Sequence, residues 1–92
     1  MANNLFITYD LIKTKDYAAV HNAIKVLGGW AKVTESNWYV NSSFSAEEAA
    51  KKVKAAMDND DKLIVVDASN NYFYGYNIDP TVLKFMQDNW YK

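Results

Sequence analysis

The sequence predicts a single α+β domain in which two helices cover one face of an antiparallel sheet. Short β-branched and aromatic segments alternate with two longer segments whose apolar residues recur at helical spacing. A chain of 92 residues, half of them hydrophobic, is long enough for one such core and short for two. The chain contains no cysteine, which excludes disulfides and thiolate chemistry.

The first third of the chain is predicted to form a central strand and a helix. Residues 5–9 are apolar on both faces and stop at Asp10, which is typical of a strand in the middle of a sheet. From Tyr17 the apolar residues follow helical spacing. Gly28-Gly29 is expected to end this helix as a left-handed cap.

A hairpin and a second helix are predicted next. Residues 30–35 and 38–40 are β-prone, and Ser36-Asn37 between them is a typical turn pair. The second helix is expected to begin at Ser45, because Ser45 and Glu48 have the spacing of a reciprocal capping box.

Residues 62–66 are predicted to form a second strongly buried strand. The order is then strand, helix, strand, strand, helix, strand. With right-handed crossovers and short connections, the simplest arrangement is a ferredoxin-like βαββαβ sandwich with its core over residues 4–68. Two helices on one sheet face would leave the opposite face in need of a cover.

The end of the chain supplies a candidate for that cover. The run from Tyr72 to Tyr76 is aromatic and β-prone, and Asp79-Pro80 is typical of a helix start. We expect residues 72–91 to add an extra strand and a short helix that form a homodimer, within one domain spanning 1–92. Tyr and Trp are common at such interfaces because they bury a large area and keep a polar tip. The expected interface residues are Trp30, Trp38, Tyr72, Phe73, Tyr74 and Tyr76.

The charged residues argue against sequence-specific DNA binding. All ten basic residues are lysines, whereas base recognition depends largely on arginine. A net charge of −1 lacks the basic footprint of a nucleic-acid-binding domain. The sequence also has no apolar run long enough to span a membrane and no recognisable secretory signal, so a cytoplasmic protein is expected.

Several short motifs, in order, resemble the CRISPR-associated protein 2 superfamily. The opening strand ends in Tyr9-Asp10, as in that superfamily. Its small stand-alone members called SinR-like are similar at Gly29-Trp30, Ser36-Asn37-Trp38 and Tyr74-Gly75. The resemblance spans roughly residues 4–90. It implies a ferredoxin-like homodimer with a fifth strand packed across the two-fold axis, and an association with prokaryotic defence or mobile elements.

Asp10 is the candidate catalytic and metal-ligating residue. Some members of the superfamily are metal-dependent nucleases that use the aspartate at this position. The resemblance therefore implies that the paired Asp10 carboxylates of a dimer bind Mg²⁺ or Mn²⁺, which prefer oxygen ligands and promote phosphodiester cleavage. The alternative is a strand-end aspartate that accepts backbone hydrogen bonds in the next turn.

Two other groups of titratable residues are interpreted as structural. His21 is the only histidine, and no carboxylate is predicted beside it, which favours a position on the helix surface. Asp58, Asp60 and Asp61 lack the glycine and glutamate spacing of a calcium loop, which favours a solvated turn.

Two functions follow as expectations. Because the arginine-bearing surface of DNA-holding relatives is missing, we expect a homodimeric binding or scaffold protein in defence or counter-defence, of host or phage origin. Its partner would be a protein or a small nucleotide, and it would require no cofactor. The alternative is a Mg²⁺- or Mn²⁺-dependent endonuclease that uses paired Asp10 carboxylates.

Overall fold

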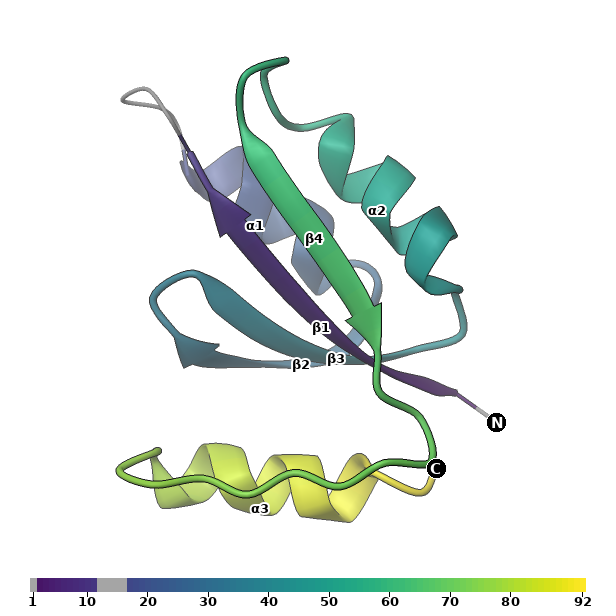
Figure 1. Cartoon of the computed structure of the whole chain (residues 1–92), viewed down its shortest axis with the longest axis vertical. Coiled ribbons are helices and arrows are strands. Elements are labelled where there is room, and N and C mark those ends of the chain that lie inside the picture. The colour runs from purple at the N-terminus through teal and green to yellow at the C-terminus, as the bar shows by residue number, and fades with distance from the viewer. Residues whose placement is uncertain (1, 12–16) are drawn as a thin grey trace.

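A computed structural model describes residues 2–11 and 17–92, which form an α+β fold with a four-stranded antiparallel sheet and three helices (Figure 1). The strand order is β2-β3-β1-β4, so β1 lies inside the sheet as predicted. The strands are β1 (Asn3–Asp10), β2 (Gly28–Thr34), β3 (Asn37–Ser42) and β4 (Lys62–Asp67). The helices are α1 (Tyr17–Lys25), α2 (Ala46–Lys54) and α3 (Pro80–Asn89).

One face of the sheet is covered by α1 and α2, and the main core lies between them. Because side chains alternate along a strand, Leu5, Ile7 and Tyr9 of β1 share this face. They pack against Val20 of α1 and Val53 of α2, and all five are nearly inaccessible to solvent. Burying an aliphatic side chain of this kind contributes about 1.5–3 kcal/mol.

The capping box predicted for α2 is confirmed. The Ser45 hydroxyl accepts a hydrogen bond from the Glu48 backbone N–H at 3.1 Å, and Glu48 Oε1 accepts one from the Ser45 N–H at 3.0 Å. These bonds favour the charged carboxylate and lower the pKa of Glu48. The helix therefore begins where the sequence places it.

The predicted left-handed cap at Gly28-Gly29 is wrong. Helix α1 ends at Lys25, both glycines belong to β2, and no described glycine has a positive φ. Gly28 instead allows a close approach between strands, because a Cβ atom there would collide with the backbone oxygen of Asn41. Glycine is therefore required at position 28 because the two strands of the hairpin approach too closely there to admit a side chain.

The hairpin itself is confirmed, but its turn lies one residue earlier than predicted. Glu35 and Ser36 form the turn. Asn37 already belongs to β3, where it pairs with Thr8 of the central strand. Strand pairing thus determines where the turn ends.

Strand β4 is not the strongly buried strand that the sequence predicts. It lies at the edge of the sheet, and none of the helices in the described part of the chain covers one of its faces. Ile64 is 61% exposed and Val66 is 49% exposed, because their side chains point to that uncovered face. The apolar composition of 62–66 therefore reflects an exposed surface as well as a core.

The extra C-terminal strand is also absent from the described sheet. Residues 72–76 have no strand pairing and run beside α3, as Figure 1 shows for the segment between β4 and that helix. The Phe73 ring lies 4.6 Å from the Trp90 ring, and the small Gly75 admits the Leu83 side chain. The chain therefore folds residues 72–76, which we call the aromatic segment, onto its own helix α3.

Helix α3 covers part of the second sheet face. It begins as predicted, with Asp79 as N-cap and Pro80 at the first helical position. A second core forms where Met86 and Trp90 pack on Tyr39 of β3, with Phe6 at its margin. The cover expected from a twin subunit is thus supplied in part by the chain itself, over the β2 and β3 side.

Buried hydrogen bonds fasten the end of α3 to the sheet; we call their donors and acceptors the Asn4 network. Asn4 Nδ2 donates to the Trp90 carbonyl at 2.6 Å, and the Tyr39 hydroxyl donates to Asn4 Oδ1 at 2.7 Å. Asn41 Nδ2 donates to the Asn89 carbonyl at 3.0 Å. Because buried carbonyls at a helix end need donors, these amides allow α3 to end against the sheet.

In residues 2–11 and 17–92, no helix combines the length and the apolar character required to cross a membrane.

Candidate functional site

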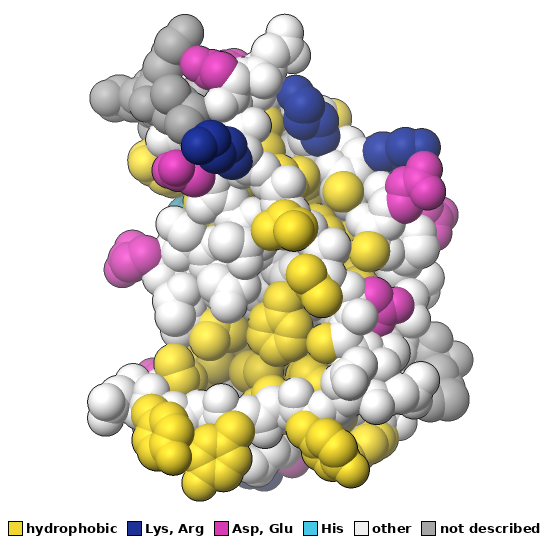
Figure 2. Space-filling view, viewed as in Figure 1, with side chains coloured by type: hydrophobic (Ala, Val, Ile, Leu, Met, Phe, Trp, Pro, Cys, Tyr) yellow, Lys and Arg dark blue, Asp and Glu magenta, His cyan; other side chains and the backbone are white. Residues whose placement is uncertain are grey.

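The candidate site is the part of the second sheet face that α3 leaves uncovered. It is formed by Phe6 and Thr8 of β1 and by Ile64 and Val66 of β4, and we call it the open half-face. Phe6 pairs with Val66 and Thr8 pairs with Ile64 in the β1–β4 register, so the four side chains lie together on one face. Figure 2 shows the hydrophobic region that continues from here toward α3.

A groove of about 290 Å³ separates the open half-face from the aromatic segment. Phe6 and Val33 line its sheet side, and Met86 lines its helix side. Tyr74 and Tyr76 complete the opposite wall. The groove thus joins the exposed strand surface to a wall of aromatic side chains, and it is open to solvent in Figure 2.

The tyrosines of the aromatic segment point outward. Tyr72, Tyr74 and Tyr76 are each at least 80% exposed, whereas Phe73 packs inward on Trp90. This alternation is the two-residue period of extended backbone. The Tyr74 and Tyr76 rings lie 5.4 Å apart and present a paired aromatic surface to solvent.

The two tryptophans expected at the same interface lie elsewhere. Trp38 is 2% exposed and belongs to the core under α1 and α2, because its position in β3 points to the first sheet face. The Trp30 ring packs 5.2 Å from the Trp38 ring and lies below the Lys25 ammonium at 4.8 Å. The predicted interface set is therefore divided between two faces of the sheet, and Trp38 is a core residue.

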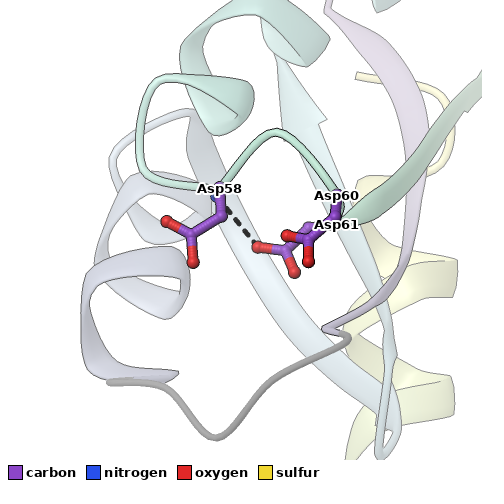
Figure 3. Close-up of side chains that lie close together, drawn as sticks. All are labelled: Asp58, Asp60 and Asp61. Atoms are coloured by element: carbon purple, nitrogen blue, oxygen red, sulfur yellow. Dashed lines mark hydrogen bonds between the residues drawn. The ribbon is translucent and has the colours of Figure 1, made fainter.

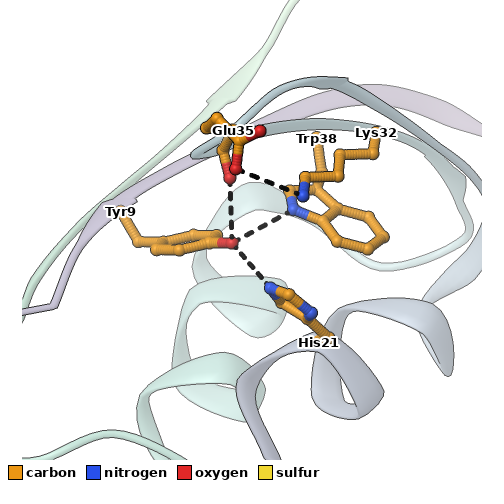
Figure 4. Close-up of polar contacts among 5 residues, drawn as sticks. All are labelled: Tyr9, His21, Lys32, Glu35 and Trp38. Atoms are coloured by element: carbon orange, nitrogen blue, oxygen red, sulfur yellow. Dashed lines mark hydrogen bonds and ion pairs between the residues drawn. The ribbon is translucent and has the colours of Figure 1, made fainter. Parts of the chain in front are cut away.

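A hydrogen-bonded cluster that the sequence did not predict lies beside Trp38 (Figure 4). The Tyr9 hydroxyl is hydrogen-bonded to His21 Nε2 at 3.0 Å and accepts a bond from Trp38 Nε1 at 3.3 Å. Burial lowers the pKa of His21, and the nearby ammonium groups of Lys32 and Lys25 lower it further. His21 therefore lies at the margin of the core, beside the apolar stripe of α1, where burial disfavours its charged form.

This cluster has the character of a structural anchor. Glu35 is the carboxylate residue drawn in Figure 4, but its carboxylate pairs with Lys32 at 3.6 Å, while its backbone oxygen is the atom near Tyr9. An acid–base histidine needs a carboxylate that orients its ring. The geometry instead joins α1 to β1 and β3 through one phenol.

Asp10 lies at the open end of β1 beside a lysine. It is exposed and pairs across the strands with Lys62, and both line a shallow pocket of about 190 Å³ with Thr8 and Ile64. Divalent cations usually bind several carboxylate or carbonyl oxygens together. Among the described residues, the group of three or more potential ligands that lie within reach of one ion does not include Asp10.

That group is Asp58, Asp60 and Asp61, in the loop from α2 to β4 (Figure 3). The ligand oxygens lie within 4.8 Å of one another. The Asp58 backbone N–H donates to Asp61 Oδ2 at 2.9 Å, which accounts for part of this approach. The three carboxylates could hold a cation, the alternative that their spacing in the sequence did not favour over a solvated turn.

Searches of protein-family models, curated proteins and solved structures each found no match to this chain.

Proposed function

We propose that this protein is a homodimeric binding or scaffold protein that assembles through the β1–β4 side of its sheet. Its biological setting in this proposal is prokaryotic or phage defence or counter-defence. The dimer engages a protein or small-nucleotide partner and needs no metal for this role.

The observation that carries the proposal is the open half-face with its edge strand. Ile64 and Val66 remain largely exposed although each is β-branched and apolar. Contiguous apolar surface on a small protein commonly marks an interaction site. Burying both side chains in an interface would stabilise the dimer by a few kcal/mol, since a fully buried side chain of this kind contributes about 1.5–3 kcal/mol.

The setting in defence is supported by the family resemblance of residues 4–90. The ferredoxin-like part of that resemblance has support in the strand order β2-β3-β1-β4 and in the two helices α1 and α2 on one face. This is the simplest arrangement for the predicted element order. The chain departs from the fifth strand that the resemblance implies, because its aromatic segment lies along α3 and not in the sheet.

The partner class is proposed from the exposed tyrosines. Tyr72, Tyr74 and Tyr76 have apolar rings and polar tips, which suits contact with a protein. The Tyr74–Tyr76 pair also offers ring faces on which a nucleobase can stack. A long polynucleotide is disfavoured because the aromatic segment carries no lysine or arginine between its rings.

The alternative function is a Mg²⁺- or Mn²⁺-dependent endonuclease with paired Asp10 carboxylates. We disfavour it because Lys62 stands opposite Asp10 in the sheet, where its positive charge competes with a cation. Labelled DNA and RNA incubated with the protein and Mn²⁺ should remain intact. Cleavage that the Asp10→Ala variant loses would establish the nuclease and overturn the proposed role.

Light scattering at micromolar concentration tests the homodimer. The proposal requires a particle of twice the 10.5 kDa chain mass. A particle of the single chain mass throughout the micromolar range would contradict it.

A further inference from the structure

We propose that two copies join along the free edge of β4, with their β4 strands paired antiparallel across a two-fold axis at Val65. The two four-stranded sheets then form one continuous sheet. This inference rests on the proposed homodimer and specifies how its subunits meet.

The backbone of β4 has one set of hydrogen-bonding groups directed away from the sheet. On β1, the N–H of Asn4 donates to Ser69 Oγ, and its carbonyl accepts from the Ala68 N–H, so Asn4 faces the β4 side. Backbone groups alternate in direction along a strand, so Phe6 and Thr8 face that side as well. Their partners Val66 and Ile64 therefore bond inward to β1.

The odd-numbered residues of β4 consequently face outward. The N–H and carbonyl groups of Leu63, Val65 and Asp67 point to the free edge, because they alternate with the residues bonded to β1. In the described sheet, β4 pairs with β1 alone. A second strand can bond these groups without disturbing any existing pair.

The opposite edge of the sheet is protected, and β4 is not. Strand β2 has a register shift between Lys32 and Thr34. Bulges of this kind are a usual device that blocks strand addition. Strand β4 has a continuous register, no proline, and the uninterrupted apolar run 63–66. This edge is suited to accept a strand.

The sequence of β4 is complementary to itself in one register. With the axis at Val65, Ile64 lies opposite Val66 of the partner subunit, so the two exposed apolar side chains of β4 cover each other. Moving the axis to Ile64 would place Asp61 opposite Asp67 of the partner subunit, which repel. Moving it to Val66 would place Ile64 opposite the partner's Ala68, so that Ile64 and Val66 would no longer cover each other.

The charges at the strand ends are compatible with the same antiparallel arrangement. Lys62 begins the strand and Asp67 ends it. In the Val65 register, Lys62 lies opposite Ala68 of the partner subunit and Asp67 lies opposite the partner's Leu63, so no two like charges are paired. A net charge of −1 per chain adds little repulsion.

A single-cysteine variant tests the axis directly, because the natural chain has no cysteine. Directly opposed residues of a hydrogen-bonded antiparallel pair have Cα atoms about 5.5 Å apart, within the range for a disulfide. In Val65→Cys, added oxidised glutathione should accept two electrons as two thiols form the bond. We expect a reducible species of dimer mass.

Asp67→Cys is the matched control on the same outward edge. Its two copies would lie four residues apart along the paired strands, or about 14 Å, too far to bridge. Equal cross-linking of Asp67→Cys and Val65→Cys would overturn the proposed axis, because it would indicate random collisions.

A second pair of variants tests the edge without a cross-link. Ile64→Lys places a charge where the two strands would meet and should convert the dimer to a monomer. Val26→Lys is the matched control, because Val26 is an aliphatic residue that is 76% exposed and lies outside β4, just before the strand at the opposite edge, and the variant should stay dimeric. Together with the cysteine variants, these variants distinguish a failure of the proposed edge pairing from a failure of the proposed homodimer. A natural chain that is dimeric, with no Val65→Cys cross-link and a dimeric Ile64→Lys variant, would overturn edge pairing but not the homodimer. A monomeric natural chain would overturn both.

Discussion

The two faces of the sheet are closed in different ways. On the first face, α1 and α2 meet the strands through aliphatic side chains such as Leu5, Val20 and Val53. On the second face, α3 covers one side only, and its end is held by the amides and phenol of the Asn4 network. The first face is therefore closed by aliphatic packing, whereas the second combines a smaller, aromatic core with specific hydrogen bonds and is left half open.

The largest expected effect comes from truncating side chains in the two cores. Leu5→Ala removes a fully buried side chain under α1 and α2, and Met86→Ala removes one between α3 and the sheet. Each should lower the free energy of unfolding by about 2–5 kcal/mol, measured by urea denaturation. A negligible cost for Met86→Ala would indicate that α3 is not packed on the second face.

A smaller loss is expected from removing the centre of the Asn4 network. Asn4→Ala leaves the Tyr39 hydroxyl and the Trp90 carbonyl without their buried partners, at about 1–3 kcal/mol for a buried group left unsatisfied. Hydrogen exchange should accelerate in α3 and stay unchanged in α1.

Asn22→Ala is the control for that experiment, since Asn22 is an exposed residue of α1. Its exchange pattern should match that of the natural chain. Uniform acceleration across the whole molecule in Asn4→Ala would argue against a network specific to α3.

The first face should be the acid-sensitive one. The pKa of His21 is lower in the folded chain than its ordinary 6.5, so the unfolded chain binds more protons as the pH falls through 6.5. The contribution of His21 to the free energy of unfolding is therefore complete above pH 6.5 and is lost as the pH falls below it. In His21→Gln, urea midpoints between pH 7 and 5 should change less with pH than in the natural chain. An identical pH dependence would show that His21 does not carry the effect.

The second face should be the alkali-sensitive one. Burial raises the pKa of Tyr39 above its ordinary 10.0, so the unfolded chain loses the phenolic proton first as the pH rises. The contribution of Tyr39 to the free energy of unfolding is then complete below pH 10 and falls as the pH rises above it. Tyr39→Phe should remove this component from urea midpoints measured at alkaline pH, and an unchanged alkaline loss would contradict it.

The elements that the sequence predicted are those fixed by local chemistry. The Ser45–Glu48 capping box and the Asp79-Pro80 helix start need only residues close in the chain. The central position of β1 followed from its apolar character on both faces. The predicted burial of β4 and the fifth strand failed because both depend on where α3 packs.

The candidate site was predictable only in part, for the same reason. The exposure of Tyr72, Tyr74 and Tyr76 could be expected, because the rest of the sequence offers no core positions that would bury every ring of the aromatic run. The Asn4–Trp90 hydrogen bond joins residues 86 positions apart, and no local pattern indicates it. Trp38 was assigned to an interface because composition does not reveal which sheet face a residue occupies.

The central claim is that two chains meet on the β1–β4 side of the sheet, where Ile64 is exposed. Light scattering of the natural chain, Ile64→Lys and Val26→Lys at equal micromolar concentration tests it most directly. The account predicts twice the 10.5 kDa chain mass for the natural chain and Val26→Lys, and the single chain mass for Ile64→Lys. Three equal masses, whether single or double, would contradict it.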